Sequence, residues 1–140
     1  MDLIHHLNIS PTQHNSFHLM IHAVYACFLK RYQPKGKFIQ AWGAMDDSQS
    51  YRFIVDCMLN IPLLFWASEV TGYKKYYDAA YNHMQTSIAN IIRPDASSYH
   101  TFFFDPVTNK PLRGETHQGF SDDSSWARGQ SWAVYDFAVV

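Results

Sequence analysis

The sequence lacks a large excess of charge of either sign, has few cysteines and contains no long hydrophobic run. Its 11 Lys and Arg residues nearly balance its 12 Asp and Glu residues, and without a basic stripe nucleic acid is not an expected partner. Two cysteines, Cys27 and Cys57, are too few for a disulfide framework and lack metal-site spacing. No apolar segment approaches the length of a membrane span. We therefore expect no nucleic-acid or membrane partner, and no motif indicates a cofactor or a metal.

The N-terminal segment MDLIHHLNIS does not resemble a secretory signal, because it lacks a basic region followed by an apolar one. This predicts a cytoplasmic location. What the chain does have is 140 residues, of which 47% are hydrophobic and 16% aromatic. This composition is typical of one globular domain.

Helical periodicity covers much of the chain. A first helix is predicted from Ser10, a suitable N-cap, to about Tyr32. An irregular, partly surface-lying connection is expected over residues 37–53. The stretch VDCMLNIPLLFWASEVTG then predicts a second helix, which Pro62 either kinks or confines, in its regular part, to the downstream portion. A third helix is predicted over 73–92. Because Gly72 suits a helix C-terminus, the second and third helices should form an antiparallel hairpin.

After the third helix the sequence changes from helical periodicity to β-rich and turn-forming residues. The β-rich run Tyr99 to Phe104 is followed by the turn residues Asp105, Pro106 and Asn109, which predicts one short β-hairpin near 99–112. A long polar loop follows, up to Asp123. A fourth helix should then begin near Ser124, capped by a residue within 122–124.

The segment DDSSWARGQSW, residues 122–132, combines acids, serines, an arginine and two tryptophans. Two interpretations stay open at this level. Arg128 beside a helix N-terminus could hold a carboxylate, and Trp126 and Trp132 could stack on sugar rings. Alternatively, the segment is a structural helix in which Arg128 pairs with a local Asp.

Other candidate residues also have two interpretations. Asp56, among apolar neighbours, is either a helix cap or a functional acid. His100 and His117 lie in the polar loop region and are ligand candidates, although a loop histidine is commonly a solvated residue. His14, His18 and His22 are spaced four apart but have no acidic companion, so a metal site is not assigned.

From Ile39 onward the chain resembles the unsaturated glucuronyl hydrolases, glycoside hydrolase family 88. Several spaced motifs in family order carry the resemblance, and they cover most of residues 39–137. They are IQAWG, VDCMLNIPLLFWASEVTG, SSYHTFFFDP, THQGFSDDSSWARGQSW and the following Tyr135.

The resemblance implies an all-α fold, part of an (α/α)6 toroid of helical hairpins. It also implies a substrate, the 4,5-unsaturated uronic acid at the non-reducing end of glycosaminoglycan or pectin fragments. In the family an Asp protonates C4, water adds at C5, and the resulting hemiketal opens so that the glycosidic bond breaks. By this resemblance Asp56 is the general acid/base. The matched substrate-binding positions are Trp42, His100, Gln118, Ser124, Trp126, Arg128 and Trp132.

The chain also departs from the family pattern. The family has an upstream aromatic pocket residue and a second essential Asp in a His-Asp motif, whereas LIHHLNIS has Asn8. Position 136 is Asp where the family usually has Gly. We therefore expect residues 1–140 to be a single incomplete catalytic domain, an internal fragment of such a hydrolase. A catalytically inactive remnant that at most binds uronates, and an unrelated all-α interaction protein, are the alternatives. The oligomeric state is left unassigned.

Overall fold

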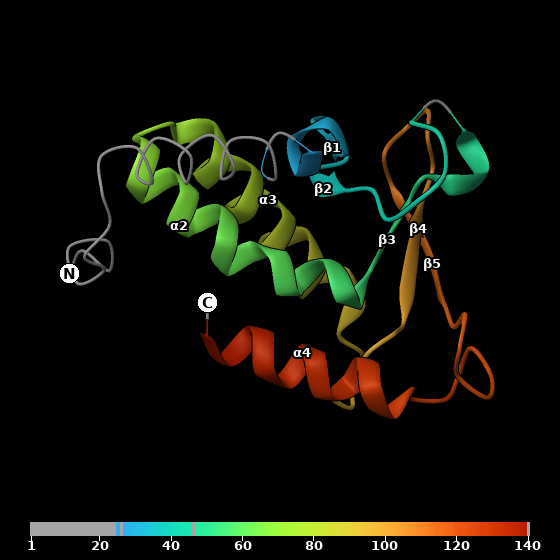
Figure 1. The fold of residues 1–140 in the computed structure, drawn as a ribbon. Coiled ribbons are helices and arrows are strands. Elements are labelled where there is room, and N and C mark those ends of the chain that lie inside the picture. The colour runs from blue at the N-terminus through green and yellow to red at the C-terminus, as the bar shows by residue number, and fades with distance from the viewer. Residues whose placement is uncertain (1–24, 26, 46, 140) are drawn as a thin grey trace.

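The computed structural model describes residue 25 and residues 27–45 and 47–139. Within this part, helices lie on one side and a small sheet on the other (Figure 1). The helices are η2 (Ser48–Ser50), η3 (Val55–Asn60), α2 (Ile61–Thr71), α3 (Lys74–Ile91) and α4 (Ala127–Val139), of which η2 and η3 are of the 3-10 type. The strands are β1 (Tyr32–Gln33), β2 (Phe38–Ile39), β3 (Arg52–Ile54), β4 (Thr101–Phe104) and β5 (Pro111–Glu115).

The predicted helical hairpin is confirmed as α2 and α3. Pro62 stands at the start of α2, where its missing N–H costs no helical hydrogen bond. Gly72 ends α2 in the left-handed conformation with φ of 70°, and its N–H donates to the Ser68 carbonyl. The two helices then pack through small and apolar residues of one buried cluster. This cluster includes Met58, Ile61, Leu64, Ala67, Tyr76 and Ala80.

The predicted β-hairpin is also present, as the antiparallel pair β4 and β5. The prediction missed a third strand, β3, which pairs with β4 so that Phe53 lies opposite Phe102. All four residues of β4 are buried, so it lacks the polar–apolar alternation of a one-sided strand. Because β3 has only three residues and its partner lies far along the chain, local pattern gave no signal for it. About half of the described part is therefore helical, with two small sheets, so the expected all-α fold with one short hairpin holds only in part.

The segment 37–53 was predicted to be an irregular connection, partly on the surface, and this is wrong at both of its ends. Its start, Phe38 and Ile39, pairs with β1 and is fully or nearly fully buried. Its end forms β3. Pro34 and Gly36 lie in the turn between β1 and β2. The first predicted helix lies mostly outside the described residues, and its helical part at 27–30 ends just before the predicted end at Tyr32.

The fourth helix was predicted to begin near Ser124, but α4 begins at Ala127. The predicted capping residues are used elsewhere. Asp122 accepts a hydrogen bond from the Thr116 N–H through its side chain. The carbonyls of residues 122–124 accept hydrogen bonds from the guanidinium of Arg93. Because these hydrogen bonds from Arg93 hold the backbone of residues 122–124 in a loop, α4 begins three residues later than predicted.

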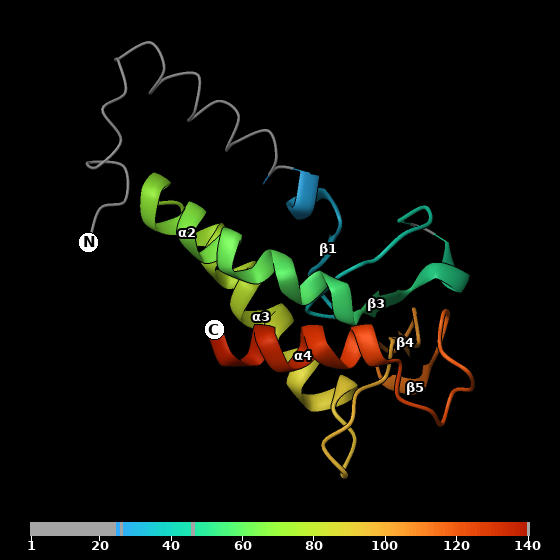
Figure 2. The same cartoon turned by 60° about the horizontal axis from the view of Figure 1, so that its bottom comes forward.

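Helix α4 packs against the short helix η3, which leads into the helical hairpin. Its N-terminal end lies near η3 and the start of α2, and it runs on in the same general direction as α2 (Figures 1 and 2). Contacts between α4 and η3 hold this end in place. No helix within the described residues combines the length and the apolar character that crossing a membrane requires.

We predict that Gly72→Ala destabilises the fold without any steric clash. A Cβ at this position would meet no atom within 4 Å, so the cost comes only from holding a non-glycine residue at positive φ, about 1 kcal/mol. Denaturant unfolding followed by circular dichroism measures it. Gly72→Asn is the matched control, because Asn tolerates this conformation better and should lose less. Equal losses for both variants would contradict the explanation.

Candidate active site

Asp56 is the second residue of η3 and has a partly buried side chain. Its side chain is 32% exposed, and its Oδ2 atom is buried and accepts no hydrogen bond from the described residues. The N-cap of η3 is Ile54 and that of α2 is Asn60, neither with a side-chain cap bond. The interpretation of Asp56 as a helix cap is therefore wrong. A carboxylate oxygen that is buried without such a bond is a candidate for proton transfer.

His100 lies next to Asp56, immediately before β4. Its side chain is only 3% exposed, and its Nε2 atom stands 3.9 Å from Asp56 Oδ2. Its Nδ1 atom accepts a hydrogen bond from the His117 backbone N–H at 2.9 Å. A neutral imidazole with Nδ1 as acceptor carries its proton on Nε2. The backbone of His117 thus fixes the tautomer of His100 whose N–H is on the side of Asp56.

Burial is the main reason that the pKa of His100 lies below its ordinary value. The negative charge of Asp56 opposes this by raising the pKa, while the nearby His117 and Arg52 lower it. Since the ordinary pKa of 6.5 is already below neutrality, His100 is neutral at neutral pH. It can therefore donate one hydrogen bond from Nε2 without adding a positive charge beside Asp56.

The aromatic and basic residues of α4 extend this pair. The Trp126 ring lies 4.3 Å from the His100 ring and meets Trp132 edge-on at 5.5 Å. The Arg128 guanidinium stands 5.0 Å from the Trp126 ring centre and 5.8 Å from that of Trp132. Among the described residues no carboxylate forms an ion pair with Arg128. The alternative in which Arg128 pairs with a local Asp is therefore wrong.

Gly129 allows α4 to reach the site. This glycine is buried, and a Cβ here would stand 3.1 Å from Val55 Cγ1 and 2.6 Å from an atom of the Trp126 ring. Val55 directly precedes Asp56. A side chain at position 129 would push α4 away from η3 and with it Trp126, so the close approach depends on glycine.

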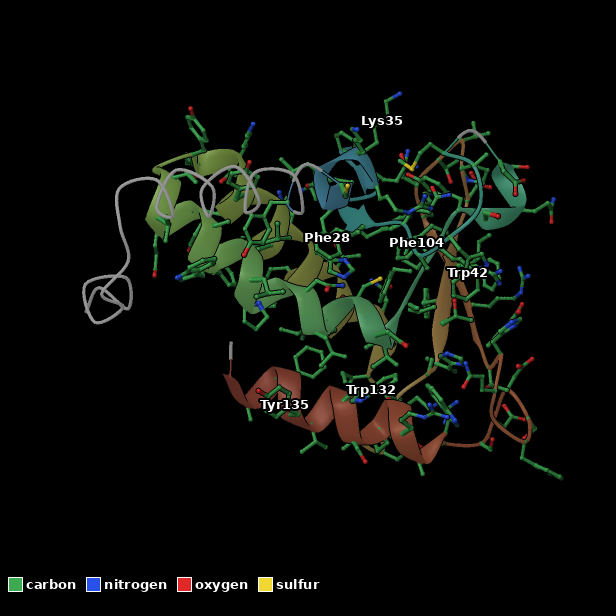
Figure 3. All side chains as sticks on the ribbon, in the orientation of Figure 1. Phe28, Lys35, Trp42, Phe104, Trp132 and Tyr135 are labelled. Atoms are coloured by element: carbon green, nitrogen blue, oxygen red, sulfur yellow. The ribbon has the colours of Figure 1, made fainter. Side chains whose placement is uncertain are left out.

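Trp42 joins the cluster from the other side, through His117. Their ring centres are 5.5 Å apart, and the His117 ring lies 6.4 Å from that of His100. The loop of Trp42 is held by the buried Gln40 side chain, whose amide donates to the carbonyls of Trp42 and Ala44. In Figure 3, Trp42 lies beside the β3–β5 sheet, and Trp132 lies on the side of α4 that faces α2.

Two predicted site residues take no part in these contacts. Gln118 is exposed, and its side chain forms no hydrogen bond within the described part of the chain. The Ser124 hydroxyl accepts from the Ser121 N–H and donates to the Ser121 carbonyl, which occupies it in the loop before α4. The structure thus brings together six of the eight predicted positions, namely Trp42, Asp56, His100, Trp126, Arg128 and Trp132. The predicted histidine stripe at residues 14, 18 and 22 lies outside the described residues.

Sequence reasoning missed Arg52 at this site. Its guanidinium carbon stands 4.3 Å from the centre of the Trp42 ring. The only local signal was its place four residues before Asp56, and that signal does not distinguish a site residue from a surface one. A cavity of about 450 Å³ lies elsewhere, among residues that include Lys35, Asp47 and Asn109. It contains no predicted site residue, so cavity volume does not locate this cluster.

A carboxyl group, a neutral histidine, arginines and tryptophan rings in one place define a class of site suited to an anionic sugar. The comparisons with known proteins agree with this class. The sequence model of Glycosyl Hydrolase Family 88 matches residues 7–140, and the chain belongs to this family.

Relatives and solved structures give the same result. The unsaturated chondroitin disaccharide hydrolase of Streptococcus pneumoniae is 60% identical over 112 residues, which is 80% of this chain and 28% of the relative. The crystal structure of the unsaturated glucuronyl hydrolase of Bacillus sp. GL1, described as responsible for the degradation of glycosaminoglycan, has a TM-score of 0.85 at 42% identity. That match covers 89% of this chain and 33% of the other. The chain therefore spans about a third or less of the length of these proteins.

We predict that Asp56→Asn lowers the pKa of His100 further. The negative charge of Asp56 raises this pKa, so its removal must shift the titration to lower pH. Imidazole nitrogen and carbon chemical shifts, followed by NMR as the pH is lowered, measure both the pKa and the tautomer. Asp78→Asn is the control, because Asp78 pairs with Lys74 on the exposed surface of α3. An unchanged or raised His100 pKa in Asp56→Asn would show that the two groups do not interact.

Proposed function

We propose that the protein to which these residues belong removes a 4,5-unsaturated uronic acid from the non-reducing end of an oligosaccharide by hydrating its double bond. The observation that supports this most is the Asp56 carboxyl group, buried on one oxygen beside a neutral His100. Tryptophan rings lie beside the pair, together with an arginine that forms no ion pair with a carboxylate in the described residues. The substrate is a flat anion, for which such rings and cations are complementary.

In this proposal Asp56 is the catalytic acid and base. Its protonated carboxyl group delivers a proton to C4 of the double bond, and a water adds its oxygen at C5 while the carboxylate takes up the proton that the water releases. The hemiketal formed at C5 then opens, the glycosidic bond breaks and the remaining sugar leaves with its hydroxyl group. This differs from hydrolysis at the anomeric carbon, where two carboxyl groups flank the bond.

His100 serves as a positioning residue in the same proposal. Its Nε2–H faces Asp56 Oδ2 at 3.9 Å, which is longer than a hydrogen bond and can shorten when a site closes on its ligand. Trp42 and the α4 tryptophans offer faces for the sugar rings, and Arg128 offers two parallel N–H donors for the uronate carboxylate. Gln118, exposed on the loop before α4, is proposed as a further contact to the sugar.

We further propose that the complete fold is an (α/α)6 toroid, with α2 and α3 as one of its hairpins. The likeness to the Bacillus sp. GL1 structure supports this. For the substrate, the name of the Streptococcus pneumoniae relative favours unsaturated chondroitin disaccharide as the first compound to test. A pectin-derived disaccharide with the same unsaturated ring tests the alternative source.

We predict that Asp56→Asn lowers turnover by about 10²–10⁴-fold, the usual effect of losing a positioned acid–base group. Because the chain spans 28% of the relative, the assay uses the complete Streptococcus pneumoniae protein with its matched segment replaced by that of this chain. The fall in ultraviolet absorbance of the conjugated double bond measures the rate. KM should change little, since the amide has the same shape as the carboxyl group.

Asp78→Asn, on the exposed side of α3, is the control and should retain the parent rate. If Asp56→Asn also retained it, the acid would be another residue. If the parent chimera bound unsaturated disaccharides without turnover, the site would be a binding site only, as in the alternative of an inactive remnant. The 140-residue chain is assayed in parallel for both binding and turnover.

A further inference from the structure

The side chain of Arg52 lies between two aromatic rings at the edge of the candidate site. Its guanidinium carbon is 4.3 Å from the Trp42 ring centre and 4.6 Å from that of Phe103. Phe103 is its cross-strand partner on β4, so the backbone register sets this stacking. The Nε atom of Arg52 is buried and donates to no group in the described residues.

Among the residues that the structure describes, no carboxylate neutralises Arg52 by a direct ion pair. The two acids close enough to raise its pKa are Glu115 and Asp47, and burial outweighs both by lowering it. Glu115 instead pairs with Arg113, and Asp47 accepts from the Ser50 hydroxyl and the Gln49 N–H. Arg52 therefore keeps a positive charge that aromatic rings, rather than an acid, hold in place.

This arrangement affects what Trp42 can bind. Because the guanidinium covers one face of the indole ring, a sugar can stack only on the opposite face. A cation behind the ring offsets the negative potential of its π face and attracts an anion placed in front. The charge of Arg52 also reaches the centre of the site, since it is one of the groups that lower the pKa of His100.

We propose that Arg52 is a specificity-determining residue that makes the Trp42 face of the site prefer an ionised uronate over a neutral sugar of the same shape. Arg52 acts through Trp42, so it is a positioning residue rather than a catalytic one. This inference rests on the proposed function, because it concerns the substrate of the same site.

The test compares an unsaturated disaccharide with its uronate methyl ester, which keeps the ring and the double bond but has no charge. The measured quantity is the ratio of kcat/KM for the acid to kcat/KM for the ester, in the same chimeric protein. Arg52→Met should lower this ratio about five-fold, the effect expected for one unit charge acting from behind a ring in a partly solvated site. Arg52→Lys keeps the charge but loses the planar stacking on the rings, so it should retain only part of the ratio.

Arg113→Met is the matched control. Arg113 stacks on the same Phe103 ring, at 4.7 Å, but has no such contact with Trp42. The control also carries Glu115→Gln, because Glu115 pairs with Arg113 and would otherwise be free to neutralise Arg52, so the ratio should stay unchanged. The ratio is taken within each folded variant, so a change in stability or in the amount of active protein cancels. As a second readout, Arg52→Met should raise the pKa of His100, measured by NMR on the 140-residue chain.

The outcomes separate the two proposals. A parent chimera that hydrolyses neither compound fails the proposed function, and the role of Arg52 falls with it. A parent that hydrolyses the acid, with an Arg52→Met ratio equal to that of the parent, leaves the proposed function intact and overturns the role of Arg52. An equal loss of ratio in the Arg113→Met control would also overturn it, since the effect would then come from Phe103 rather than from Trp42.

Discussion

The pairing of β3 with β4 is the interaction on which the rest of the site depends. It continues past β3 as a backbone hydrogen bond of 2.9 Å from the Val55 N–H to the His100 carbonyl. This one bond joins the residue before Asp56 to the residue whose imidazole faces it. The same pairing places Arg52 opposite Phe103. A shift of the β3–β4 register by one residue would turn these side chains to the other face of the sheet, and the site would no longer form.

The short helix η3 is held in place because it contributes buried side chains to two different hydrophobic clusters. Val55 belongs to the aromatic cluster beneath the sheet, whereas Met58 belongs to the cluster of the helical hairpin. Both are fully buried, so the short helix has little freedom to move, and Asp56 stands between them with a defined direction. The neighbouring Cys57 is buried as well, which raises its pKa to about 11. Its thiol is therefore inert beside the carboxyl group.

Short sequence patterns correctly predicted the structural features that depend on residues close together in the chain. Gly72 predicted the hairpin of α2 and α3, and the residues around Asp105 predicted the turn between β4 and β5, since turn and cap preferences act over a few residues. Features that depend on distant partners were missed. Strand β3 is defined by a partner about 50 positions away, and α4 begins late because Arg93, some 30 positions upstream, holds the preceding loop. For the site, the resemblance supplied Asp56 and the tryptophans, but Arg52 and the bond that fixes the His100 tautomer required coordinates.

The charged groups of the site are held by partners that leave them available to a substrate. Arg52 and Arg128 both rest on tryptophan rings, and neither forms an ion pair with a carboxylate in the described part of the chain. Aromatic rings hold a guanidinium without consuming its charge or all of its N–H donors. Asp56, in turn, forms no ion pair with a lysine or an arginine that the structure describes, and the neutral His100 stands 3.9 Å from its Oδ2 atom. Both kinds of group thus stay available, the arginines for an anion and the carboxyl group for a proton, which the proposed hydration requires at the same moment.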